Sequence, residues 1–385
     1  MPYRAARLVA LTVFVLSLFP ASSRAQLAVS ANDGKAVLVD GVPTTPASPL
    51  ADTVSVIDLN VSPPKVIAEI KAPASVVGPP LSVAVAPDES IALVTAAMKV
   101  DPADATKTVP DNKVSVIDLK AKPPAVIATL EAGLGAAGVS FNRAGNLVLV
   151  ANRSEGTVSV FTVSGKTLSP VGKVDFGAKA SGPSHVVFSI DGKTALVTRD
   201  GDNKISVLSV DGGKVEYTKR DLGAGLRPYG IDVASKGDAA VVANIGTGAG
   251  DTDTVSVIDI AAKPPRVVDT VSVGQTPEGL KLSPDGRYVA VGVMNGSNKP
   301  KASPFYSNNG LLKIFSLKNK RLVPVAEAKV GHWCQGIAFS KDNKTVLVQC
   351  MVENEIMVFG FDGKKLTAKP SIKATGPAGI RTAER

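Results

Sequence analysis

The sequence is poor in the side chains that most often build metal centres and aromatic cores. Aromatic residues make up 4% of its 385 residues, and it holds only two histidines and two cysteines. Two histidines far apart in the chain do not make a zinc site, so we expect no metal and no bound cofactor. Apolar residues nevertheless make up 44%. A large core must therefore be built mainly from Val, Ala, Leu and Ile.

Long apolar runs and clustered basic residues are also scarce. The formal net charge is +9, but no Lys/Arg block lies among aromatics, which argues against nucleic-acid binding. The one long apolar run, Leu8–Pro20, follows Arg4 and Arg7 and precedes the small residues of ASSRAQ. This layout predicts a signal peptide over residues 1–25, because the run is shorter than the ~20 residues that span a bilayer. We expect a periplasmic or secreted protein with no membrane span in the mature chain.

One strand-like phrase recurs along the whole chain. β-branched residues dominate each copy and apolar positions alternate, as in a β-strand. A polar turn of the Asp-Gly type and an apolar strand precede most copies, as in SPDGRYVAVG (residues 283–292), which is hairpin chemistry. A short strand comes before that turn, and a fourth strand follows the phrase. The seven copies lie at residues 54–59 (VSVIDL), 114–119 (VSVIDL), 158–163 (VSVFTV), 205–210 (ISVLSV), 255–260 (VSVIDI), 312–317 (LKIFSL) and 356–361 (IMVFGF).

The repeating unit is therefore a four-stranded antiparallel sheet, which cannot bury both of its faces alone. Radial stacking buries them all, so we predict an all-β fold, a seven-bladed β-propeller over residues 26–385 as one domain. A β-sandwich would not explain seven copies of one phrase. The chain after residue 26 enters the repeat near its polar turn, whereas GPAGIRTA (residues 376–383) has the form of an innermost strand. We expect this last strand to complete the first blade and close the ring, because an open ring exposes strand edges.

Several segments resemble a known repeat. LVANRSEGTVSVF (residues 149–161), VVANIG (residues 241–246) and SPDGR (residues 283–287) are similar to the repeat of YVTN-type seven-bladed propellers, found in many secreted bacterial proteins. That family includes surface-layer and periplasmic binding proteins. It is also similar to the lactonase-type propellers that open six-phosphogluconolactone.

One face of the propeller is expected to be rich in loops. The connection between the second and third strands is minimal in the third blade, but long in four others, at residues 42–52, 98–112, 245–253 and 294–309. Long ordered loops on a rigid scaffold usually bind something. We therefore favour a non-catalytic binding scaffold, whose partner is an unidentified protein or a small anionic or carbonyl-bearing ligand. Candidate ligand-binding residues at the links into the innermost strands are Tyr229, His332, Trp333, Gln335 and Arg381.

The lactonase-like resemblance implies an alternative, a hydrolase that opens a sugar lactone. It centres on His185 in the segment GPSHVVF, as general base or as the group that polarises the ring carbonyl. Arg227 and Glu278 would assist at the channel mouth. The next blade reads RPYG where the family tends to show Gly-Pro-Arg-His. A second alternative is an accessory subunit of a periplasmic redox enzyme, which needs no cofactor ligands in this chain.

The two cysteines are placed to face each other. Cys334 opens the innermost strand of the seventh blade and Cys350 ends the second strand, each at the same distance from Asp342 at the centre of the turn. In an oxidising compartment we expect a cross-strand disulfide, provided that the Cα atoms lie within ~7 Å. A pair of reactive thiols near the channel is the alternative.

Overall fold

The computed structural model describes Met1 and residues 26–78 and 80–384. The predicted signal peptide, apart from Met1, lies outside the described residues. The described chain is almost entirely strand, with one short 3₁₀ helix, η1 (Lys179–Ser181). No helix within it is long and apolar enough to cross a bilayer. The predicted all-β class is confirmed.

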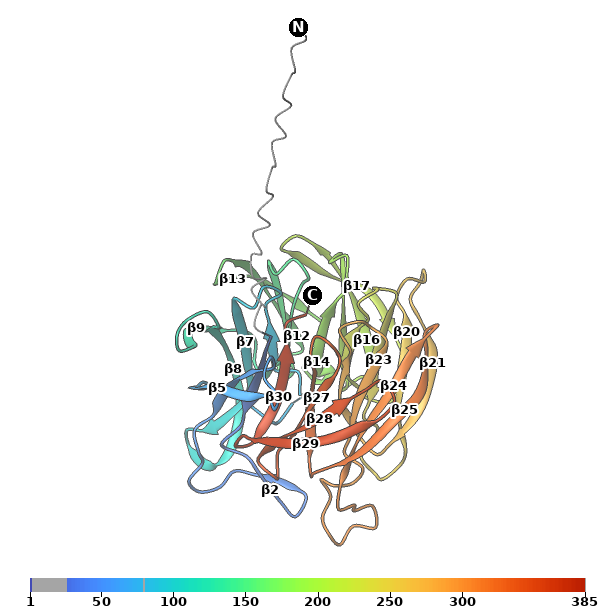
Figure 1. The fold of residues 1–385 in the computed structure, drawn as a ribbon. Coiled ribbons are helices and arrows are strands. Elements are labelled where there is room, and N and C mark those ends of the chain that lie inside the picture. The colour runs from blue at the N-terminus through green and yellow to red at the C-terminus, as the bar shows by residue number, and fades with distance from the viewer. Residues whose placement is uncertain (2–25, 79, 385) are drawn as a thin grey trace.

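Seven four-stranded antiparallel sheets form the blades of a propeller (Figure 1). Each blade is given from its inner to its outer strand. Blade 1 holds β30 (Pro377–Thr382), β1 (Leu27–Asn32), β4 (Thr53–Asp58) and β5 (Lys65–Lys71); blade 2 holds β6 (Val83–Val85), β7 (Ile91–Asp101), β8 (Asp104–Asp118) and β9 (Ala125–Glu131); blade 3 holds β10 (Ala136–Phe141), β11 (Leu147–Asn152), β12 (Thr157–Ser164) and β13 (Thr167–Asp175). Blade 4 holds β14 (Pro183–Phe188), β15 (Thr194–Arg199), β16 (Lys204–Asp211) and β17 (Lys214–Leu222); blade 5 holds β18 (Pro228–Val233), β19 (Ala239–Asn244), β20 (Asp253–Asp259) and β21 (Arg266–Gly274); blade 6 holds β22 (Pro277–Leu282), β23 (Tyr288–Val293), β24 (Gly310–Lys318) and β25 (Arg321–Val330); blade 7 holds β26 (Cys334–Phe339), β27 (Thr345–Cys350), β28 (Glu355–Phe361) and β29 (Leu366–Lys373).

The ring is closed by the C-terminal strand, as predicted. β30 pairs antiparallel with β1, so that Val29 lies opposite Arg381. Gln349 of blade 7 contacts both of these paired strands. Its Nε2 donates to Ser30 Oγ of β1 at 2.7 Å and to the Gly379 carbonyl of β30 at 3.1 Å. The two ends of the described fold thus share one blade.

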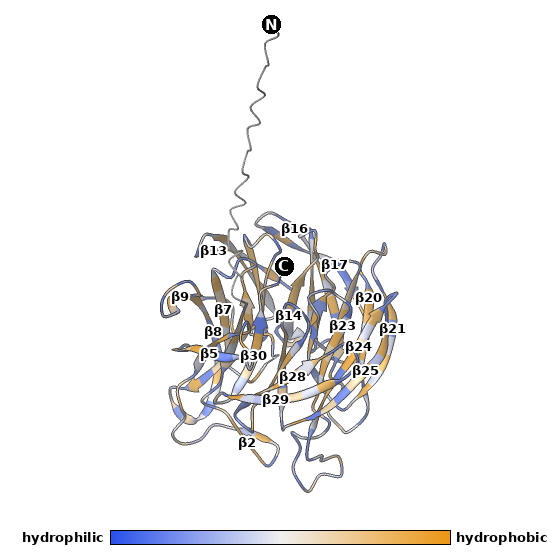
Figure 2. Ribbon diagram, viewed as in Figure 1, coloured by the Kyte–Doolittle hydropathy of each residue, from blue (hydrophilic) through white to orange (hydrophobic). Residues whose placement is uncertain are grey.

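The core lies between the blades. Strands in the middle of a blade are buried on both faces, as in β11, whereas outer strands such as β5 alternate between exposed and partly buried residues. Figure 2 shows this as orange middle strands such as β7 and β23 and paler, mixed outer strands such as β29. Phe161 and Phe339 are among the largest fully buried side chains. Most of the buried hydrophobic residues are nevertheless Val, Ala, Leu and Ile, so their burial supplies most of the hydrophobic stabilisation.

A glycine layer crosses the inner strands at their third residue. Five of the seven inner strands carry glycine there, at residues 138, 230, 279, 336 and 379. A Cβ added to Gly279 would lie 1.8 Å from the Gln335 carbonyl oxygen, so the neighbouring strands approach too closely for a side chain. The layer divides the channel-lining residues into two groups. We call the end where the inner strands begin the loop mouth, and the end where they finish the tail mouth.

The long insertions gather at the loop mouth, seen at the bottom of Figure 1. Residues 42–52 contribute β3 (Val42–Thr44), which pairs with β2 (Val37–Val39). The blade 6 insertion contacts this hairpin through Lys301 N and Asp40 Oδ1, 3.0 Å apart, and the blade 5 insertion through Lys299 Nζ and the Gly248 carbonyl. These loops are therefore packed against one another.

One segment that was predicted as a loop consists of paired strands in the structure. Residues 98–112 form a two-stranded ribbon, because β7 and β8 continue to pair beyond the blade, with Met98 opposite Pro110 and Val100 opposite Thr108. The apolar and β-branched residues on both arms favour the extended pairing.

Candidate functional site

The loop mouth presents one polar side chain from each of four consecutive blades. They are Ser184, Tyr229, Glu278 and Gln335, each the second residue of its inner strand. The register of every one of these strands shifts directly around this residue, as between Pro277 and Gly279 in β22. Such a bulge re-aims a side chain, which places the four groups on one end of the channel.

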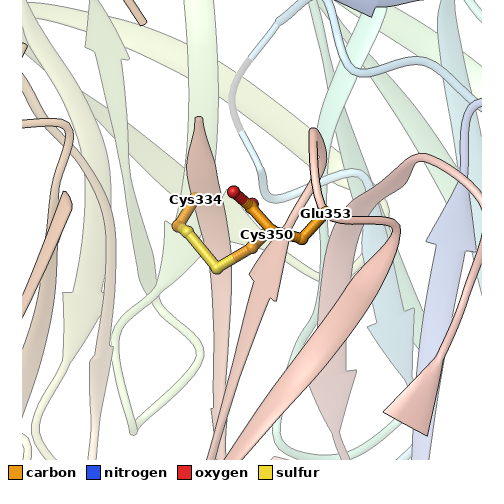
Figure 3. Close-up of side chains that lie close together, drawn as sticks. All are labelled: Cys334, Cys350 and Glu353. Carbon is orange, nitrogen blue, oxygen red and sulfur yellow. A yellow bond between two sulfur atoms is a disulfide. The ribbon is translucent and has the colours of Figure 1, made fainter. Parts of the chain in front are cut away.

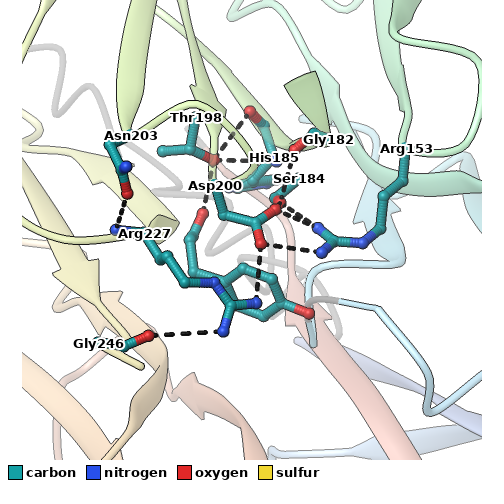
Figure 4. A network of polar contacts seen from close by, with 10 residues as sticks. Arg153, Gly182, Ser184, His185, Thr198, Asp200, Asn203, Arg227 and Gly246 are labelled. Atoms are coloured by element: carbon teal, nitrogen blue, oxygen red, sulfur yellow. Dashed lines mark hydrogen bonds and ion pairs between the residues drawn. The ribbon is translucent and has the colours of Figure 1, made fainter. Parts of the chain in front are cut away.

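Two arginines converge on one buried carboxylate beside these groups (Figure 4). The side chain of Asp200 is 2% exposed. Arg153 Nη2 donates to its Oδ2 at 2.9 Å, Arg227 Nη2 to the same oxygen at 3.0 Å, and Ser184 Oγ to its Oδ1 at 2.6 Å. Burial alone would raise the pKa of Asp200, but Arg153, Ser184 and Arg227 hold it below its usual value. Asp200 is therefore an ionised anchor that fixes both guanidinium groups.

Glu278 lies within the electrostatic reach of both arginines. Gln335 Nε2 donates to its Oε2 at 2.6 Å. Burial raises the pKa of Glu278 to about 7, against the lowering effects of Gln335, Arg153 and Arg227. A carboxyl group with this pKa exchanges its proton near neutrality, which suits a general base or acid.

The cluster has the charge to hold an anion or a polarised carbonyl. Arg227 and Arg153 remain 39% and 29% exposed, so a ligand in the mouth can reach them. Tyr229 packs under Arg153, whose guanidinium carbon is 5.4 Å from the ring centroid. Burial raises the pKa of the Tyr229 hydroxyl, which therefore stays protonated and can donate a hydrogen bond. Guanidinium groups bind carboxylates and phosphates through paired hydrogen bonds.

The structure places His185 in the glycine layer, one residue beyond Ser184, with its imidazole turned to Ile231 of blade 5. Its Nδ1 is 2.9 Å from the Ile231 carbonyl oxygen, and because a carbonyl only accepts, Nδ1 carries the proton. Burial, followed by the charge of Arg381, lowers the pKa of His185 to about 3, so the imidazole is neutral. Arg381, Glu384 and Lys281, the charges that act on it most, belong to the tail mouth. Its catalytic role stays a prediction.

Three predicted ligand-binding residues do not join the cluster. His332 Nδ1 lies 2.6 Å from Glu353 Oε1. Trp333 is 6% exposed and packs in an apolar cluster that includes Met294. Arg381 lies near the end of β30, at the tail mouth, where its Nη1 donates to the Ile337 carbonyl at 3.2 Å. Its predicted position at the same mouth as Glu278 is therefore corrected.

Sequence reasoning missed two members of the cluster, Arg153 and Asp200. Each is the first residue after the second strand of its blade, in the neighbouring blades 3 and 4. Opposite charges at the same repeat position of adjacent blades are a signal that an alignment of the repeats against one another would have shown.

The predicted disulfide is confirmed. Cys334 lies directly opposite Cys350 in the pairing of β26 with β27, and their Cα atoms are 4.0 Å apart. Figure 3 shows the bond beside the carboxylate of Glu353. The crosslink joins the two inner strands of blade 7 immediately before Gln335, and so fixes one wall of the loop mouth.

Comparison with known proteins gives a family match and several structural likenesses. The family described as "Lactonase, 7-bladed beta-propeller" matches residues 108–222 and 138–324. No curated protein matches the chain. A proposed 6-phosphogluconolactonase of Bacteroides uniformis superposes with a TM-score of 0.72 at 17% identity, over 93% of this chain and 99% of that one.

Two further solved structures show how widely the fold is used. The periplasmic gluconolactonase of Pseudomonas aeruginosa has a TM-score of 0.65 at 18% identity, over 93% of this chain and 99% of that one. Hydrazine synthase of Kuenenia stuttgartiensis has a TM-score of 0.62 at 18% identity, over 80% and 91%. At this identity the likenesses establish the propeller fold alone.

Proposed function

The chain belongs to the seven-bladed β-propeller lactonase family, and we propose that it hydrolyses a sugar lactone at the loop mouth. One observation carries the proposal: Glu278, with a pKa near neutrality, lies among two accessible arginines that a buried Asp200 holds in place. This favours the hydrolase over the binding scaffold that the sequence alone suggested. No observation favours an accessory redox subunit. We further propose that the protein acts in the periplasm or outside the cell.

The proposed reaction assigns one role to each group. Ionised Glu278 takes a proton from a water molecule, whose oxygen attacks the lactone carbonyl carbon. Arg153 and Arg227 stabilise the negative charge that develops on the carbonyl oxygen. The ring C–O bond then breaks, and the leaving alkoxide takes the proton from Glu278. The product is an open hydroxy acid, which releases its carboxyl proton to solvent, and the arginines also stabilise the resulting carboxylate. Gln335 orients Glu278 through its 2.6 Å hydrogen bond.

The test is hydrolysis of a panel of sugar lactones, with and without a phosphate group, by residues 26–385. Glu278→Gln should lower turnover by about 10²- to 10⁴-fold, the usual contribution of a general base. Glu327→Gln is the matched control, because Glu327 lies on the outer strand of the same blade with its side chain 54% exposed. Its turnover should equal that of the unmodified protein.

Two outcomes would contradict the proposal. A large loss in His185→Ala, with full activity in Glu278→Gln, would move the reaction to the glycine layer. Turnover no faster than spontaneous hydrolysis with every lactone, by protein shown to be folded, would leave the binding scaffold as the better interpretation.

A further inference from the structure

The tail mouth contains a cavity that the proposed lactone site does not use. Its volume is about 370 Å³, and it is surrounded by the ends of the inner strands of six blades and by the turn after β6 of blade 2, which contributes Glu89. This volume falls within the range of small-molecule sites, ~300–1,000 Å³. Phe141, Phe188 and Phe339 give it aromatic walls. The glycine layer lies between this cavity and Glu278.

Two buried cations lie at or beside the cavity: Lys281 lines it, and Arg381 directly precedes the lining residue Thr382. The side chains of Lys281 and Arg381 are 11% and 4% exposed. Lys281 Nζ is 3.0 Å from Asp232 Oδ2, which also accepts a hydrogen bond from Leu282 N at 2.8 Å. Asp232 is therefore the ion-pair partner of Lys281 on the side of blade 5. A buried charge is costly unless it is paired.

The chain itself supplies the missing carboxylate. Glu384 Oε1 lies 2.7 Å from Lys281 Nζ and 3.9 Å from Arg381 Nε. Burial alone would raise the pKa of Glu384, but Lys281 and Arg381 hold it well below its usual value. Glu384 follows the end of β30, and its side chain is 44% exposed. The position between the two cations thus holds a carboxylate that can move out into solvent.

We propose that the tail mouth is a second ligand site, for a small carboxylate with an apolar body, which displaces Glu384 from Lys281 and Arg381. Without Glu384, Lys281 keeps only Asp232 as its ion-pair partner and Arg381 loses the carboxylate nearest to it, so a monocarboxylate in the place of Glu384 would restore both contacts. The aromatic walls receive the apolar body, whose burial contributes about 25 cal/mol per Å². A sugar acid lacks such a body, so the ligand class differs from the product of the loop mouth.

The test is calorimetric titration of residues 26–385 with octanoate, with octanol and acetate as the two partial probes. Octanoate should bind, and octanol should bind about tenfold more weakly or worse, because it lacks the charge-assisted hydrogen bonds. Acetate lacks the apolar body and should bind more weakly still. Glu384→Gln should tighten octanoate binding by about two- to fivefold, because the competing partly exposed ion pair is removed.

Two further variants locate the binding and separate it from the lactonase proposal. Ser140→Trp, which fills the cavity from the wall of blade 3, should abolish octanoate binding with the thermal midpoint checked in parallel. Glu216→Gln, on the outer strand of blade 4 with a side chain 60% exposed, is the matched control for Glu384→Gln. Glu278→Gln should leave octanoate binding unchanged.

The proposal is overturned if octanoate does not bind, or if octanol binds equally well, since the cations would then play no part. It is also overturned if Glu384→Gln weakens binding or leaves it unchanged. Glu384 would then be a permanent cap of the channel. None of these results depends on whether the loop mouth turns over a lactone.

Discussion

The two mouths of the channel present opposite arrangements of charge. At the loop mouth a carboxylate, Asp200, is buried and the arginines around it are partly exposed; at the tail mouth Lys281 and Arg381 are buried and a carboxylate, Glu384, is partly exposed. β22 contributes to both, with Glu278 before its glycine and Lys281 after it. A repeat of small strands can therefore build two chemically distinct sites by changing residues a few positions apart.

The largest effect should come from removing the strand that both mouths share. Deleting residues 376–385 removes β30, which buries Ile380 and leaves β1 as an open inner edge. We expect a loss comparable with the whole stability of a domain, about 5–15 kcal/mol, and aggregation through the exposed edge. Thermal unfolding and light scattering would measure both, with deletion of residue 385 alone as the control. A truncated protein that melts like the complete one would disprove ring closure.

The next largest effect should be the difference in unfolding free energy between variants of the two buried aspartates, Asp200 and Asp232. Asp200→Asn leaves Arg153 and Arg227 without their common anion, and should lower the free energy of unfolding by about 3–5 kcal/mol. Asp232→Asn should cost about 1–3 kcal/mol, because Lys281 keeps Glu384 and an amide oxygen can still accept from Leu282 N. Urea unfolding at pH 7 measures both. Equal losses would mean that the two mouths do not differ in how their charges are neutralised.

Sequence reasoning predicted the features that follow from the repeating unit of the blades. The seven strand phrases, the closing strand and the cysteine pair follow from periodicity, which also placed Tyr229, Glu278 and Gln335 at one mouth. Arg381 was assigned to that mouth as well, although it lies four residues beyond Pro377. At about 3.3 Å per residue, that distance carries it roughly 13 Å along the strand, to the other mouth. Only an explicit count along the strand separates the two.

The remaining errors concern groups whose place depends on partners from other blades. Trp333 belongs to the kind of residue that often binds ligands, but it packs in an apolar cluster with Met294 and Met351. The sequence around Trp333 does not predict these contacts, because its partners are distant in the chain. His185 shares its layer with glycines, so its imidazole packs against the neighbouring blade, where a Cβ added to Gly138 would lie 2.5 Å from its Cδ2. The residue type alone suggested chemistry, whereas the layer determines where the ring lies.

The smallest expected effect concerns how stability depends on pH at the loop mouth. Burial raises the pKa of Glu278 from its usual 4.5 to about 7, so the folded state holds this proton more tightly than the unfolded chain does. The stability that the neutral form provides is complete below pH 4.5 and is lost as the pH rises through 7. Glu278→Gln removes this dependence, and should make the protein more stable than the unmodified chain at pH 8, by about 1–3 kcal/mol, with little difference at pH 4.

The stability that Asp200 contributes depends on pH in the opposite direction. Its pKa is lowered in the folded state, so this stability is present at neutral pH and is lost only in acid. Urea unfolding at both pH values measures the contribution of Glu278, with Glu327→Gln as the control variant. If the free energies of unfolding of Glu278→Gln and of the unmodified protein differed by the same amount at pH 4 and pH 8, Glu278 would have an ordinary pKa. The proposed lactone site would then lack its general base, whereas the proposal for the tail mouth would not be affected.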